Sequence, residues 1–168
     1  MTALAGVIPV QIGGETSNIE VVRHVPGVGT ALDDFVIEAK WGDKNIRVLN
    51  PISLLASKLE LAATVSQDGR NDVLHLKILV PCVRAFLETI LEQVEQQAIP
   101  ARDWLGLANQ ALKLTTDHRA RRIGEKHQIN WPDILPLKAI NQSRDEKIRT
   151  FRLQQLEQGY RKSKGISI

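Results

Sequence analysis

Two polar side chains in the first half of the sequence have the chemistry to bind phosphate and metal. Lys58 falls on the polar side of a predicted helix, where its ammonium group could hold a triphosphate. Glu20 falls in the middle of a predicted strand, where its carboxylate could hold Mg²⁺. Residue types alone favour a simpler interpretation, in which Lys58 and Arg70 are solvated and Asp72 only caps a helix. A carboxylate such as Glu20 also usually lies on the solvent face of a sheet.

The rest of the chain contains no complete catalytic motif. Gly13-Gly14 is followed by Thr16 and Ser17, but the spacing of a phosphate-binding loop is absent, so a turn between strands is the better interpretation. The four histidines have no metal-ligand spacing. The single cysteine, Cys82, rules out an internal disulfide bond and a cysteine-based zinc site, and we expect it to be a buried small residue.

Charge is divided unevenly between the two parts of the chain. Residues 1–100 contain 8 Lys and Arg against 12 Asp and Glu, a net charge of −4, whereas residues 101–168 contain 14 against 7, a net charge of +7. This asymmetry indicates either an anionic partner of the basic half, such as RNA or another nucleic acid, or a solvated helical surface whose two halves attract each other. A further alternative is that the C-terminal helices meet a partner protein. The cations with few acidic neighbours, which could reach phosphates, are Arg119, Arg121, Arg122, Arg161, Lys162 and Lys164.

The spacing of apolar residues changes at Asn50. Before it the sequence predicts four strands, at residues 7–12, 18–25, 35–40 and 45–49. Asn50-Pro51 is typical of a helix start, and helices are predicted over residues 51–65, 72–97, 101–114 and 143–161, with shorter helical segments between residues 117 and 140. Pro81 is expected to kink the second of these helices or to split it.

This order of elements predicts an α+β fold. A small N-terminal antiparallel or mixed sheet in residues 1–50 would be followed by a C-terminal helical bundle in residues 51–168, basic toward its end. No apolar run approaches the roughly 18 residues that a membrane span needs. The N-terminus lacks the basic start of a secretory signal, so we expect a cytoplasmic protein without a membrane partner.

Two stretches of sequence carry a resemblance to a known family. The string IRVLNPISLLASKLELA, followed by GRNDVLHLKILVPCVRAFL, resembles the second half of nucleotidyltransferase-fold proteins, including abortive-infection (AbiEii-type) toxins and related uncharacterised bacterial proteins. The segment IEVVRHVPGVG is similar to the strand that carries the third metal carboxylate of that family. The resemblance covers somewhat under half of the chain.

The resemblance implies a function and assigns roles to residues. It implies a bacterial defence or toxin protein that moves a nucleotide onto RNA or protein with Mg²⁺. Glu20 would be the third metal carboxylate and the catalytic residue. Lys58 would meet the nucleotide phosphates, and Arg70 and Asp72 would be the polar residues that open the next helix at the nucleotide site.

The chain departs from this family at its defining signature. The signature is Gly-Gly or Gly-Ser, a spacer and then Asp-x-Asp. Gly13-Gly14 is present, but residues 24–28 contain no aspartate, and Asp33-Asp34 come too late and lack the spacing. Two alternating carboxylates on one strand share a face, which a two-metal site requires. The sequence therefore predicts either a truncated member or one that has lost catalysis, inactive alone. The alternative function is a non-enzymatic module that binds nucleic acid or protein.

Overall fold

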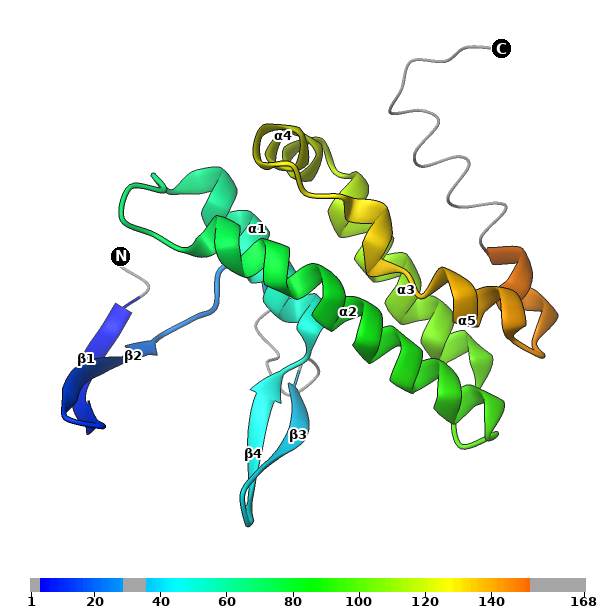
Figure 1. Ribbon diagram of the computed structural model, residues 1–168, viewed down its shortest axis with the longest axis horizontal. Helices are drawn as coiled ribbons and strands as arrows, with labels where there is room; N and C mark the ends of the chain where they lie inside the picture. Colours follow the sequence, from blue (N-terminus) through cyan, green and yellow to red (C-terminus); the bar gives the residue numbers. More distant parts are fainter. Residues whose placement is uncertain (1–3, 29–35, 152–168) are drawn as a thin grey trace.

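The computed structural model describes residues 4–28 and 36–151, and confirms the predicted α+β class. Two β-hairpins occupy the N-terminal part, and helices make up the rest of the described chain (Figure 1). The change of character predicted at Asn50 is also correct, because the last strand ends at Leu49 and the first helix begins at Pro51. The division into residues 1–50, as the β-rich part of a nucleotidyltransferase-like domain, and residues 51–168, as the helical part, stays a prediction.

The strands form two separate two-stranded antiparallel sheets, the first of which pairs β1 (Leu4–Ile12) with β2 (Glu15–Val22). The second pairs β3 (Val36–Trp41) with β4 (Lys44–Leu49). Gly13 and Gly14 both have positive φ, which a two-residue hairpin turn of this kind requires, so the predicted turn is confirmed. Both hairpins stand off from the helices in Figure 1.

The first helix, α1 (Pro51–Thr64), begins as the sequence predicts. The side chain of Asn50 accepts a hydrogen bond of 2.9 Å from the backbone N–H of Ser53, and Pro51 takes the first helical position. Ile52 and Leu55 are fully buried in the core, as their spacing on one stripe predicts.

The second helix, α2 (Asp72–Glu95), runs through Pro81, so the predicted split is wrong and the alternative, a kink, stays a prediction. Proline removes the hydrogen bond that its N–H would donate to the carbonyl four residues earlier, at Lys77. Pro81 and Lys77 are both exposed, so water can solvate that carbonyl. Cys82 is also exposed, which contradicts the expectation that it is buried.

The exposure of Pro81 leads to a stability prediction. Pro81→Ala should raise the free energy of unfolding by about 1 kcal/mol, because alanine restores the helix hydrogen bond and proline is the worst residue for a helix interior. Urea denaturation followed by circular dichroism would measure the change. A loss of several kcal/mol would show instead that the packing around α2 depends on the proline.

The remaining helices pack against α1, α2 or α3. They are α3 (Ala101–Thr116), α4 (His118–His127), the 3₁₀ helix η2 (Trp131–Ile134), α5 (Leu137–Gln142) and a helix over residues 146–151. The last of these was predicted to begin at Ser143 and to reach Arg161; it begins three residues later, and its predicted end lies outside the described residues. Within residues 4–28 and 36–151, every helix is too short or too polar to span a membrane.

Candidate nucleotide-phosphate site

Three of the residues proposed for nucleotide binding form one ion-paired cluster. Lys58 Nζ donates to Asp72 Oδ1 over 2.9 Å, and Arg70 Nε donates to Asp72 Oδ2 over 2.6 Å. The Asp72 side chain is 3% exposed, whereas those of Lys58 and Arg70 are 22% and 40% exposed. The carboxylate therefore lies inside the cluster, and the two cations form its outer side.

The turn between α1 and α2 brings these residues together from three segments. Lys58 lies in α1, Arg70 in the connection, and Asp72 is the first residue of α2. Gly69 has a φ of +67°, a conformation that favours glycine, and the backbone N–H of Arg70 donates to the carbonyl of Gln67 over 3.1 Å. This tight turn directs the chain back so that α2 packs along α1 (Figure 1).

Asp72 was predicted to cap α2, and the structure places it one residue further in. Asn71 is the capping residue, and its side chain makes no capping hydrogen bond. A carboxylate in the first turn still interacts favourably with the positive end of the helix dipole. The side chain of Asp72 is thus used for the ion pairs rather than for the cap.

The ionisation of Asp72 follows from its partners. Burial alone would raise its pKa, but the hydrogen bonds from Arg70 and Lys58, with their charges, outweigh burial and hold the pKa of Asp72 below its ordinary value. Asp72 is therefore a carboxylate at neutral pH, and the cluster of three side chains carries a net charge of about +1.

The structure does not place Glu20 in this cluster. Its backbone lies in β2 opposite Val7, in the hairpin that stands off from the helices (Figure 1), and its side chain lies outside the described part of the structure. Its assignment as the catalytic and metal carboxylate stays a prediction.

Groups of three metal-ligating side chains do not occur in the described part of the structure. In residues 4–28 and 36–151, no three His, Cys, Asp or Glu side chains lie close enough together to hold a metal ion. Asp72 is the carboxylate of the cluster. It already accepts hydrogen bonds from Lys58 and Arg70, so it is a poor ligand for an additional metal cation. The binding proposed below accordingly uses the side chains of the chain itself.

The cations proposed for nucleic-acid binding divide into two groups. Arg119, Arg121 and Arg122 lie on α4, where Arg119 pairs with Glu60 over 3.0 Å and lies 3.7 Å from Asp117. Arg161, Lys162 and Lys164 lie outside the described residues. Arg122 lines a groove of about 500 Å³ between α1 and α4, together with Lys126. We did not predict Lys126 from the sequence, although its position four residues after Arg122 on a helix was a usable signal.

Comparisons with protein-family models, with curated proteins and with solved structures find no match to this chain. Two features of the chain bear on its function: the resemblance carried by its sequence and the geometry of the cluster.

Proposed function

We propose that this chain is a nucleotidyltransferase-like protein of a bacterial defence or toxin type, acting on RNA or protein, and that Lys58 and Arg70 bind the phosphates of a nucleotide. The observation that carries the proposal is that Lys58, Arg70 and Asp72, assigned to one site by the resemblance, lie in hydrogen-bonding contact although Lys58 and Asp72 are 14 residues apart.

The cluster retains donors that a phosphate can use. An ammonium group has three N–H donors and a guanidinium group has five, and Asp72 takes one from Lys58 and one from Arg70. The remaining donors belong to side chains that are partly exposed, so an anion can reach them. Charge-assisted hydrogen bonds to phosphate are among the stronger polar interactions.

Asp72 is proposed as a positioning residue. Its carboxylate fixes the ammonium group of Lys58 and the guanidinium group of Arg70 side by side, which lowers the conformational entropy lost when they bind a phosphate. Without it, two like charges on flexible side chains would repel each other. An intact Asp72 therefore makes the cluster a preorganised cationic surface.

We propose binding without catalysis for this chain alone. The sequence has no Asp-x-Asp pair to place two carboxylates on one strand face. The chain should bind a nucleoside triphosphate and should not transfer its nucleotidyl group with Mg²⁺ or Mn²⁺. Robust transfer that is lost in Glu20→Ala would contradict this part of the proposal.

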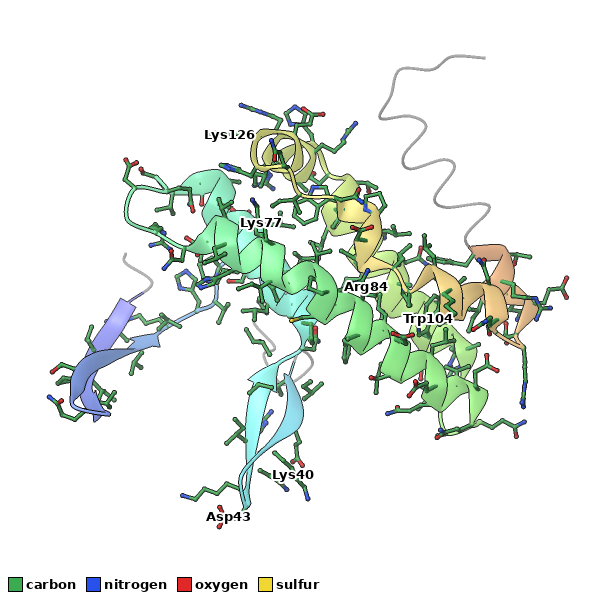
Figure 2. The ribbon with its side chains drawn as sticks, viewed as in Figure 1. Lys40, Asp43, Lys77, Arg84, Trp104 and Lys126 are labelled. Atoms are coloured by element: carbon green, nitrogen blue, oxygen red, sulfur yellow. The ribbon has the colours of Figure 1, made fainter. Side chains whose placement is uncertain are left out.

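Calorimetric titration with ATP, with and without Mg²⁺, tests the nucleotide site. Lys58→Gln should weaken binding by about tenfold, equivalent to about 1.4 kcal/mol, because it removes one charge-assisted hydrogen bond. Lys77→Gln is the matched control, since Lys77 is an exposed lysine on α2 and should leave ATP binding unchanged (Figure 2).

Thermal unfolding of both variants would verify that they are folded. Equal weakening by Lys58→Gln and Lys77→Gln would show that ATP responds only to overall charge. No ATP binding by the wild-type chain would contradict the proposed function directly.

A further inference from the structure

We infer that the groove between α1 and α4 binds the phosphodiester backbone of a single nucleic-acid strand. This groove, called here the α1–α4 groove, has a volume of about 500 Å³ and is lined among others by Ala62, Gln67, Arg119, Arg122, Lys126 and His127. The inference goes beyond the proposed nucleotide site and does not require a nucleotide at Lys58.

Three cations of α4 lie on the groove side of that helix. Arg119, Arg122 and Lys126 are spaced by three and four residues, which places them on one helical face. The face extends for about 10 Å along the helix axis, given a rise of about 1.5 Å per residue. A strand with a rise of about 3.4 Å per phosphate places about four phosphates along this length, so each of the three cations has a phosphate within reach.

Two of these cations form no ion pair within the described part of the chain. Arg119 is held by Glu60 of α1 and is largely neutralised. Arg122 and Lys126 make no ion pair with another described residue, and Glu125 is the one acidic side chain in the groove lining. Lys126 lies in the last turn of α4, where a cation interacts favourably with the helix dipole. The helix dipole therefore explains the charge of Lys126 but not that of Arg122.

The surrounding structure fixes the orientation of this basic face. Trp131 is 4% exposed, and its Nε1 donates to the carbonyl of Ala120 in α4 over 2.8 Å. Gly124 leaves the space for that ring, because a Cβ there would lie 2.5 Å from Trp131 Nε1. Arg119 and Glu60 tie the other side of α4 to α1. These contacts hold α4 in place, so its cations line the α1–α4 groove before any strand binds.

The opposite wall indicates how the strand is recognised. Ala62 and Ala63 of α1 are small, so a sugar–phosphate backbone can approach closely. No Phe, Tyr or Trp side chain lines the groove in the described structure, which disfavours base stacking there. Binding should accordingly be independent of base sequence and strongly dependent on salt.

The test is a fluorescence-anisotropy titration of the full chain with short single-stranded RNA and DNA of the same sequence, at about 50 to 200 mM salt. The double variant Arg122→Ala/Lys126→Ala should lower affinity for both strands by roughly tenfold or more. Its slope of log affinity against log salt should be shallower by about 1.4, because each phosphate of a single strand that a cation neutralises adds about 0.7 to the slope.

Lys77→Ala/Arg84→Ala is the matched control, because it removes two exposed cations from α2 rather than α4 (Figure 2). It should leave both affinity and slope unchanged. Three results would overturn the inference: no binding at low salt, equal losses in the two double variants, or equally tight binding of a polyglutamate peptide. The last result would indicate an acidic protein partner. Lys58→Gln should leave strand binding intact, so failure of this inference and failure of the nucleotide site are distinguishable.

Discussion

Replacing Trp104 with alanine is expected to lower the free energy of unfolding by about 3–5 kcal/mol, the range for large aromatic residues in cores. Trp104 of α3 is fully buried, and its Nε1 donates to the carbonyl of Leu87 in α2 over 2.8 Å. Its ring meets that of Phe151 edge to face, with centroids 5.7 Å apart. The substitution therefore removes packing from α2, α3 and the helix over residues 146–151 at once; Trp104 is labelled in Figure 2.

Urea denaturation with circular dichroism would measure this loss, and Trp104→Phe would separate packing from hydrogen bonding. Phenylalanine keeps most of the buried area and loses the donor, so its cost should be smaller, about 1–2 kcal/mol. A loss below about 1 kcal/mol for Trp104→Ala would show that the helices do not pack as described.

Replacing Asp72 with alanine is expected to lower the free energy of unfolding by about 2–3 kcal/mol at neutral pH. Removing one partner of a buried ion pair is costly because it leaves charge without compensation. The cost stays below the full range for buried pairs, since water reaches Lys58 and Arg70. Asp68→Ala is the matched control, because Asp68 is an exposed carboxylate in the same connection and should change stability by less than about 0.5 kcal/mol.

The contribution of Asp72 should also depend on pH in one direction. Its pKa is lower in the folded chain than in the unfolded chain, where the ordinary value is about 3.9. The stabilisation is therefore complete above that value and is lost as the pH falls through the lowered folded value. The stability difference between wild type and Asp72→Ala should be constant above about pH 5 and should shrink below about pH 4. A difference that grows on acidification would contradict the ion-paired state of Asp72.

Local signals in the sequence predicted the positions of several elements. Asn50-Pro51 combines a side-chain acceptor with a residue preset for the first helical turn, so the start of α1 depends on two neighbours. Gly13-Gly14 supplies positive φ at both turn positions, so the turn of the first hairpin is also determined by neighbouring residues. Pro81 differs from these signals, because its effect on α2 depends on whether water reaches the backbone carbonyl of Lys77. The exposure of that carbonyl is set by how the helices pack, and not by neighbouring residues.

The candidate site could be predicted only in part. The residue types of Lys58, Arg70 and Asp72 were available from the sequence, but their contact depends on the conformation of the turn at Gly69 and on the packing of α2 along α1. Residue types alone favoured solvated side chains at Lys58 and Arg70, and both cations are instead bonded to Asp72. The basic face of α4 became visible once the structure set Arg122 and Lys126 against the small residues of α1.

The most direct test of the proposed phosphate site is an NMR titration of the ¹⁵N-labelled chain with a non-hydrolysable nucleoside triphosphate. The proposal predicts that the largest shift changes occur at the backbone amides of Lys58, Arg70 and Asp72 and at the Nε–H of Arg70. In Lys58→Gln the same changes should need about tenfold more ligand. Changes confined to α4, or no changes at all, would contradict the assignment of the nucleotide phosphates to Lys58 and Arg70.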